Sequence, residues 1–211
     1  HAEDPLLLEA DLLAALERLP DRVHVVLAGD GPNLEDLRRQ ALGLRLRGRV
    51  HFLGHRDDVP VILQNADLFC VPSRMEGLGT SVLDAMAAGV PVVAPPAGGT
   101  PALAEPGLSG LLVSPGRPDL LAGALAAVLE DPPLARRLVQ GGRERVRKFS
   151  VERMVEGTLR VYEAVLAGSL EPVPARRRLV VAVRAPQPVP APVSSAILSV
   201  RRTGEGVDAP S

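Results

Sequence analysis

A short segment between Val71 and Ala94 carries the residue types best suited to chemistry. It reads as an apolar strand, a glycine-rich loop with Glu76, a helix start and a second strand, with Asp84 eight positions after Glu76. A helix N-terminus presents unpaired N–H groups and a partial positive charge, which favour anionic groups such as phosphates. Two carboxylates beside such amides could hold hydroxyls while the amides hold a diphosphate. The segment therefore predicts a site for a nucleotide-sugar.

The elements around this segment alternate between strands and helices. Short β-branched runs such as VHVVLA are typical of strands buried on both faces, and residues with helical spacing separate them. We expect strands at 23–28, 50–53, 68–71, 91–94 and 110–113, and helices at 5–16, 33–42, 59–65, 81–88, 100–104, 119–130, 134–148 and 151–166. Repeated β-α-β units imply an α/β fold, a Rossmann-like parallel sheet with helices on both faces.

Several strand-end loops are predicted to gather at one edge of this sheet. Ligands of such sheets bind outside the carboxyl ends of the strands. The loops at 29–32, 54–58, 72–79 and 95–100 all follow strands, so they should line that edge together. Gly98-Gly99-Thr100 reads either as a second anion-facing turn or as a plain connector.

The amino-acid composition argues against several classes of protein. The chain has 211 residues, of which 46% are hydrophobic, 23% charged and 2% aromatic, and it has no Trp. Few aromatics and a net charge of -1 argue against a nucleic-acid partner. Cys70 is the single cysteine, which fits a reducing compartment, and no apolar run is long enough to cross a bilayer. Because residue 1 is His, we expect the chain to begin inside a longer protein.

The last part of the chain has a different character. Residues 168–211 include Arg176-Arg177-Arg178 and the proline-rich run PQPVPAPV, without a helical period. We expect this Pro/Arg-rich tail to be disordered. The arginines could touch an acidic lipid surface, although a solvated linker is the favoured interpretation.

The motifs together resemble one enzyme family. EGLGTSVLDAMAAGVPVV at 76–93 resembles the donor-site segment of retaining GT-B glycosyltransferases of family four, the group 1 type. LAGDGP at 27–32 is similar to that family's strand-end glycine turn, and VHFLGHRDDVP at 50–60 to its nucleobase segment. The resemblance implies that residues 1–167 form the C-terminal, nucleotide-sugar-binding domain of a GT-B fold, truncated at its N-terminal edge.

The resemblance also implies roles for individual residues. Glu76 would be the catalytic residue that holds donor-sugar hydroxyls, and Asp84 would hold ribose hydroxyls. The remaining donor-binding residues would act through their backbone, and they are Gly29, Gly31, His55, Arg56, Gly77, Leu78, Gly79 and Thr80. Such enzymes use no metal and no cofactor, because amides and basic side chains stabilise the leaving diphosphate. His24, His51 and His55 have no partners at metal-ligand spacing, which also argues against a metal site.

Alternatives remain open at several of these positions. Ser81 and Asp84 form S-x-x-D, a capping-box pattern, and Gly29 and Gly31 could be turn glycines alone. The family has Glu where this chain has Asp84, and its diphosphate-gripping Arg and Lys precede the segment that matches here. The alternative functions are therefore an inactive or degenerate nucleotide-binding fragment and, more distantly, a sugar-nucleotide epimerase.

The resemblance finally predicts partners and location. A sugar, lipid or small molecule would be the acceptor, and an N-terminal GT-B domain absent from this chain would bind it. The fragment is therefore expected to be inactive alone. A cytoplasmic location is expected, with peripheral contact to the inner face of the membrane as an open option.

Overall fold

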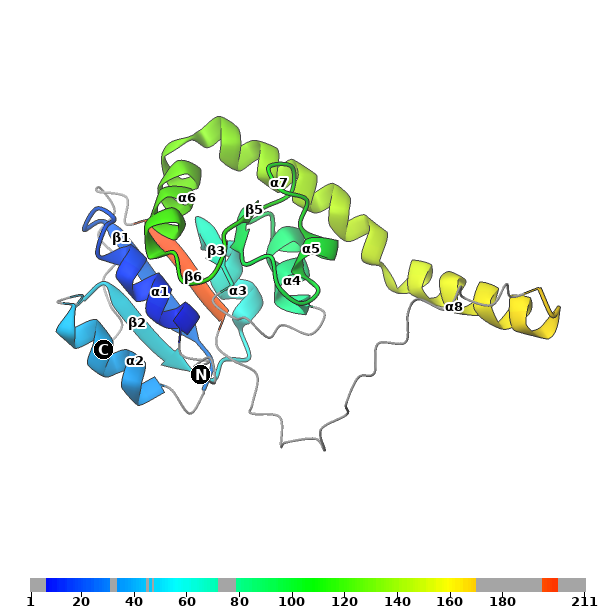
Figure 1. Cartoon of the computed structure of the whole chain (residues 1–211), viewed down its shortest axis with the longest axis horizontal. Coiled ribbons are helices and arrows are strands. Elements are labelled where there is room, and N and C mark those ends of the chain that lie inside the picture. The colour runs from blue at the N-terminus through cyan, green and yellow to red at the C-terminus, as the bar shows by residue number, and fades with distance from the viewer. Residues whose placement is uncertain are drawn as a thin grey trace.

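The chain forms an α/β domain with a single helix that projects from it (Figure 1). This computed structural model describes residues 7–30, 34–44, 46, 48–71, 79–169 and 195–200. The strands are β1 (Val23–Ala28), β2 (Val50–Gly54), β3 (Leu68–Cys70), β4 (Val92–Ala94), β5 (Leu111–Leu112) and β6 (Ser195–Val200). The helices are α1 (Leu7–Leu16), α2 (Leu34–Gly43), α3 (Val59–Gln64), α4 (Thr80–Ala88), α5 (Thr100–Leu103), α6 (Pro118–Glu130), α7 (Pro132–Val146) and α8 (Val151–Leu166), with a 3-10 turn at Arg147–Phe149.

The six strands form one sheet in the order β2-β1-β6-β3-β4-β5. The pairs β1–β2, β3–β4 and β4–β5 are parallel, as the β-α-β pattern predicts. β6 pairs antiparallel with β1 on one side and with β3 on the other. The predicted Rossmann-like sheet is confirmed, and β6 is an addition that the sequence pattern did not indicate.

Helices cover both faces of the sheet, and each face has its own apolar core. Val25, Leu27 and Cys70 pack with α1, α2 and α6 on one face. Val26 and Phe69, at alternate positions of the same strands, pack with α3, α4 and α5 on the other. This alternation is the period of two that a β-strand imposes. The strands are therefore buried on both sides, which explains their near-continuous apolar sequences.

Arg49 holds the turn that joins α1 to β1. Its side chain is 12% exposed and donates hydrogen bonds to four backbone carbonyls, those of Leu16, Leu19, Pro20 and Val23, at 2.9 to 3.1 Å. Burial lowers the pKa of Arg49, and the neighbouring Asp21 carboxylate opposes this shift. One side chain thus satisfies the backbone of a whole connection, at the edge of the sheet where β1 and β2 begin.

Glu9 in the first turn of α1 is a buried acid, and its environment predicts a pH effect. It is 2% exposed, and burial raises the pKa of its carboxyl from 4.5 to about 7. Between these two values the folded chain holds a proton that the unfolded chain has lost, so the free energy of unfolding falls as pH rises through this window. We expect Glu9→Gln to be close to neutral at pH 4 and to stabilise the fold by about 1–3 kcal/mol at pH 8.

Urea denaturation of both chains at the two pH values measures this prediction. Asp21→Asn, at a fully exposed acid, is the control and should show no comparable gain between the two pH values. A Glu9→Gln chain that is equally destabilised at both pH values would contradict it.

The last two long helices leave the body of the domain in sequence. α7 lies along α4, where Gly142 contacts Met86, and α8 then projects away from the domain (Figure 1). Ser150 caps α8, because its Oγ accepts a hydrogen bond from the Arg153 N–H at 3.3 Å. Large apolar side chains of α8 are exposed, including Met154, Leu159, Tyr162 and Leu166. In the described part of the chain, none of the helices combines the length and apolar character that a membrane span needs.

The structure corrects the prediction for the tail in one place. Residues 195–200 were expected to be disordered, whereas they form β6 in the middle of the sheet. A central position supplies two neighbouring strands, and these pair with the backbone of β6 on both sides. The remainder of the predicted tail beyond Ser169, including the Arg triplet, lies outside the described residues.

Candidate functional site

The turns after β1 and β2 meet at the carboxyl edge of the sheet. The Gly29 N–H donates a hydrogen bond to the Gly54 carbonyl at 2.7 Å, next to a register shift in the β1–β2 ladder. Gly29 has φ 131° and Gly54 has φ 66°, and a Cβ at Gly54 would lie 3.3 Å from the Asp30 carboxylate. Both positions therefore need glycine for their backbone conformation. The structure brings together the turns that contain Gly29 and His55, as the sequence predicts.

His55 and Arg56 turn their side chains toward nearby acids. Arg56 makes a two-pronged hydrogen bond to the Asp58 carboxylate at 2.7 and 2.6 Å, and His55 lies 3.4 Å from Asp57. The hydrogen bond lowers the pKa of Asp58 and raises that of Arg56. Because the Arg56 guanidinium is already paired, it is not a free cation for a diphosphate. The predicted role of the His55 and Arg56 backbone along a nucleobase stays a prediction.

The start of α4 presents an exposed face with a threonine and an acid. Gly79 is the N-cap residue in a left-handed conformation (φ 70°, ψ 46°), and it has no side chain that could accept a capping hydrogen bond. Thr80 and Asp84 are both exposed, and they stand four positions apart in the helix, so they share a face. Val82, Ala85 and Met86 occupy the buried face. Asp84 thus stands one turn into a helix whose first amides face the carboxyl edge.

The capping-box interpretation of Ser81 and Asp84 is wrong. The helix begins at Thr80 and its N-cap is Gly79, so Ser81 lies inside the first turn. A capping box needs the serine itself at the N-cap position. Of the other predicted site residues, Gly31, Glu76, Gly77 and Leu78 lie outside the described residues. Their roles stay predictions.

The ends of β3, β4 and β5 add residues that the sequence analysis did not single out. A small cavity of about 20 Å³ lies between these strand ends and is lined by Asp11, Cys70, Val71, Ala94, Pro95, Val113, Ser114, Arg117 and Leu121. Asp11 accepts a hydrogen bond from the Gly116 N–H at 2.6 Å, which holds the loop after β5 against α1. Arg117 pairs with Asp119 through two hydrogen bonds at 3.0 and 2.8 Å. The sequence signal was the R-P-D helix start at 117–119, one short loop after β5.

The volume of that cavity is far below the roughly 300–1,000 Å³ of ligand pockets, so it is no nucleotide site. Nearby, the Thr100 hydroxyl at the start of α5 is buried and has no hydrogen-bond partner among the described residues. Gly98 before it has φ 56°. The unsatisfied hydroxyl leaves the anion-facing interpretation of Gly98-Gly99-Thr100 open.

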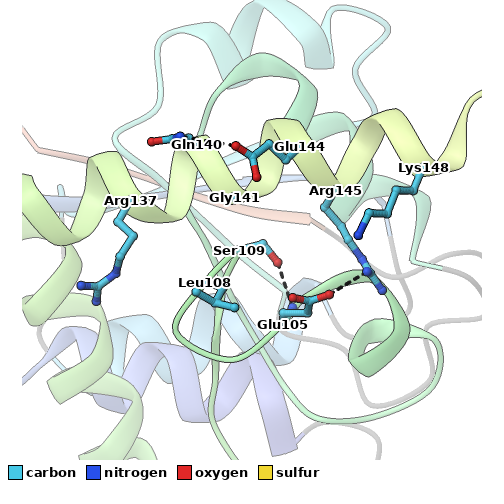
Figure 2. A pocket seen from close by; sticks show the side chains of 9 residues that line it. All are labelled: Glu105, Leu108, Ser109, Arg137, Gln140, Gly141, Glu144, Arg145 and Lys148. Carbon is cyan, nitrogen blue, oxygen red and sulfur yellow. Dashed lines mark hydrogen bonds and ion pairs between the residues drawn. The ribbon is translucent and has the colours of Figure 1, made fainter.

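A larger hollow of about 290 Å³ lies elsewhere, between α7 and the turn at Leu108–Ser109 (Figure 2). Polar side chains that line it bond to one another and to nearby backbone groups. Arg145 binds the Glu105 carboxylate at 2.7 Å and the carbonyls of Ala102 and Leu103, and the Glu105 N–H donates to Ser109 Oγ at 2.8 Å. None of the predicted site residues lines this hollow. We infer that these contacts attach α7 to the connection between α5 and β5.

Gly141 tests how closely α7 packs against this connection. A Cβ at Gly141 would lie 2.1 Å from the Leu108 carbonyl oxygen, so the backbone of one segment must shift. We expect Gly141→Ala to lower the free energy of unfolding by about 1–3 kcal/mol. Gly123→Ala in α6 is the matched control, because a Cβ there meets nothing within 4 Å, and it should stabilise the fold by about 0.5–1 kcal/mol. Equal effects of the two variants in chemical denaturation would show that α7 does not pack this closely.

The described residues are poor in clustered metal ligands. They hold no group of three or more His, Cys, Asp and Glu side chains that could bind a metal ion. His24 and His51, from neighbouring strands, stack on each other and share a hydrogen bond of 3.0 Å. Both rings therefore lie side by side across the β1–β2 pair, with His51 exposed.

The fold and the edge loops define a class of protein. A Rossmann-like sheet with glycine turns and a helix start at its carboxyl edge is the architecture expected for the C-terminal half of a GT-B glycosyltransferase. The solved structure of Anabaena Alr3699/HepE in complex with UDP-glucose matches it with a TM-score of 0.69 at 30% identity, over 78% of this chain and 46% of that chain. The chain belongs to the glycosyl transferases group 1 family, which matches residues 10–145.

Curated relatives agree with this membership. The D-inositol 3-phosphate glycosyltransferase of Salinispora arenicola is 38% identical over 158 residues, 71% of this chain and 35% of that protein. The lipopolysaccharide core biosynthesis glycosyltransferase LpsE of Rhizobium meliloti is 34% identical over 151 residues, 71% of this chain and 44% of that protein. The chain spans less than half the length of each of these relatives.

Proposed function

We propose that this chain is the donor-binding part of a retaining glycosyltransferase that takes a hexosyl group from a nucleotide-diphosphate sugar. The observation that carries the proposal is the carboxyl edge of the sheet. There the turns after β1 and β2 meet through the Gly29–Gly54 hydrogen bond, and α4 begins at an N-cap without a side-chain hydrogen bond, one turn before the exposed Asp84. The UDP-glucose that HepE binds in its solved complex supports this choice of donor class.

The chemistry follows from where negative charge develops. As the sugar leaves, charge builds on the diphosphate, and amides at a helix start stabilise it without any reorganisation. We propose that Glu76 holds the sugar, that Asp84 holds the ribose, and that the backbone at His55 and Arg56 lies along the base. On this proposal the reaction needs no metal and no cofactor.

Titration of the chain with UDP and with GDP tests donor binding directly. Asp84→Ala should weaken binding of the preferred nucleotide about tenfold, since one hydrogen bond to a charged group contributes about 1.5 kcal/mol. Glu163→Ala, an exposed helix acid on the projecting α8, is the control and should bind like the parent chain. A folded Asp84→Ala chain with unchanged affinity would remove the ribose role.

A second candidate function is a nucleotide-binding or degenerate module without transfer activity. The shorter Asp84 in place of the family's Glu favours it, because the carboxylate stands one methylene further from a ribose. No detectable binding of UDP or GDP by a folded chain would favour the degenerate alternative.

An acceptor-binding domain completes the proposal. We propose that a second, N-terminal GT-B domain binds a sugar, lipid or small-molecule acceptor, and that the present chain is inactive without it. The exposed apolar side chains of α8, such as Leu159 and Tyr162, support a partner surface beyond the described residues. A cytoplasmic location, with contact to the inner face of the membrane as an option, belongs to the same proposal.

A further inference from the structure

The hollow between α7 and the turn at Leu108–Ser109 is separate from the edge where the donor loops are predicted to meet (Figure 2). The turn directly precedes β5, which pairs parallel with β4, so it lies toward the amino ends of the strands. Its volume of about 290 Å³ is close to the lower limit of small-molecule pockets, roughly 300–1,000 Å³. The hollow is therefore large enough for one small molecule outside the donor site.

Positive side chains outnumber negative ones around this hollow. The charged residues that line it are Arg137, Arg145, Lys148, Glu105 and Glu144. Glu105 already binds Arg145 at 2.7 Å, and Glu144 accepts a hydrogen bond from the Gln140 amide at 3.3 Å. Within the part of the chain that the structure describes, neither Arg137 nor Lys148 forms an ion pair. The hollow thus keeps an excess of positive charge that suits an anion.

Ser109 adds a buried hydroxyl to the hollow. The residue is 3% exposed, and its Oγ accepts a hydrogen bond from the Glu105 N–H at 2.8 Å. The O–H of Ser109 has no acceptor among the described residues. Buried polar groups normally use their hydrogen-bonding capacity, and a hydroxyl can both donate and accept. The unused O–H therefore favours a ligand that brings an oxygen atom.

Arg145 and Glu105 are held in place, so the hollow is preformed. Each nitrogen of the Arg145 side chain donates one hydrogen bond, either to the Glu105 carboxylate or to a carbonyl of α5. The guanidinium also lies 5.5 Å from the centre of the Phe149 ring. Each terminal nitrogen of a guanidinium carries two N–H groups, so Arg145 still has N–H groups for a ligand. Glu105 binds Arg145 through one oxygen, which leaves the other oxygen as an acceptor.

Lys148 and Arg145 extend from the end of α7 toward the turn that carries Glu105, and Arg137 lies at the other end of the hollow (Figure 2). Two cations, a carboxylate oxygen and a buried O–H are thus grouped at one end. Arginine and lysine are the side chains that proteins use to bind phosphate groups. The carboxylate oxygen can accept only from a ligand that also carries donors, such as hydroxyls.

We propose that this hollow binds a small phosphorylated polyol. Lys148 and the remaining N–H groups of Arg145 hold its phosphate, and its hydroxyls bond to the Glu105 carboxylate and to Ser109. The inference concerns a second site and does not rest on the proposed donor function.

Calorimetric titration with glucose 6-phosphate tests the proposal, and glucose and inorganic phosphate are the two parts of this probe. We expect saturable binding of glucose 6-phosphate that weakens as salt is added, because the cations are partly exposed. Each part alone should bind at least about tenfold more weakly, because it makes only some of the contacts. Absence of binding would overturn the proposal, and so would equal binding of inorganic phosphate, since that result indicates an adventitious ion only.

Lys148→Met removes the ammonium group and keeps most of the aliphatic stem. It should weaken binding of glucose 6-phosphate about tenfold, the effect of losing one hydrogen bond to a charged group. Arg147→Met is the matched control, because Arg147 is the exposed neighbour of Lys148, carries the same charge and does not line this hollow. Equal losses in the two variants would show that only the net charge matters, which would overturn the site.

The donor edge is the competing place for a sugar phosphate, and amide NMR shifts locate the probe. We expect glucose 6-phosphate to shift the amides of 108–110 and 141–149 and to leave those of 28–30, 54–56 and 80–84 unchanged. The opposite pattern would place the probe at the donor edge and overturn the proposal. Nucleotide titration is a separate measurement, so failure here leaves the proposed donor binding untouched.

Discussion

Arg49→Met is expected to lower the free energy of unfolding by about 3–5 kcal/mol, the largest stability effect of the variants considered. The substitution keeps most of the aliphatic length but removes the donors to the carbonyls of Leu16, Leu19, Pro20 and Val23. Those carbonyls lie between the end of α1 and the start of β1. The Arg49 side chain that binds them is only 12% exposed. Since domains of this size are stable by about 5–15 kcal/mol, a large part of the total would be lost.

Arg22→Met is the matched control. Arg22 is 52% exposed and lies 3.4 Å from Glu130, which is 56% exposed. Exposed pairs of this kind contribute about 0–1 kcal/mol, so the same chemical change should have little effect. Arg49→Lys should fall between the two, because one ammonium cannot reach four carbonyls. Guanidinium denaturation of the three variants measures their free energies of unfolding. Similar midpoints for Arg49→Met and Arg22→Met would refute the role of Arg49.

Glu76→Ala is expected to lower sugar transfer at least about 100-fold, the range seen when a group that stabilises a transition state is removed. The proposed reason is that Glu76 holds donor hydroxyls at the sugar, where the bond breaks, whereas Asp84 acts at the ribose. Binding of the free nucleotide should therefore persist in this variant, while Asp84→Ala should weaken it. We therefore expect Glu76→Ala to lower mainly turnover and Asp84→Ala to lower mainly nucleotide affinity.

The assay needs an active assembly. Under the proposed function, a chimaera of this chain with the unmatched part of the Salinispora relative is the assembly to test. Glu163→Ala on α8 is the control and should retain the turnover of the parent assembly. Turnover that survives in Glu76→Ala would reject the catalytic role, and the nucleotide titration shows independently whether the variant still folds and binds.

The sequence predicted the elements of the sheet because their signals are local. VHVVLA became β1 with the predicted bounds, and Gly89 ends α4 in the left-handed conformation typical of that position. The edge loops could also be foreseen, since parallel strands must present their carboxyl ends together. The capping interpretation of Ser81 failed because the pattern S-x-x-D does not reveal which residue begins the helix, and a left-handed Gly79 moved that start by two positions.

What the sequence determined by itself was therefore the class of fold, since it follows from periodicity and glycine placement over a few residues, whereas the roles in the donor motif stay predictions from the resemblance. The tertiary structure decided the rest. It placed SAILSV between two distant strands, and it turned Arg49 onto the connection that ends at Val23. In both cases the contact satisfies backbone N–H or C=O groups that are brought together only when the chain folds. The residues that satisfy these groups are far away in the sequence, so no local pattern reveals them.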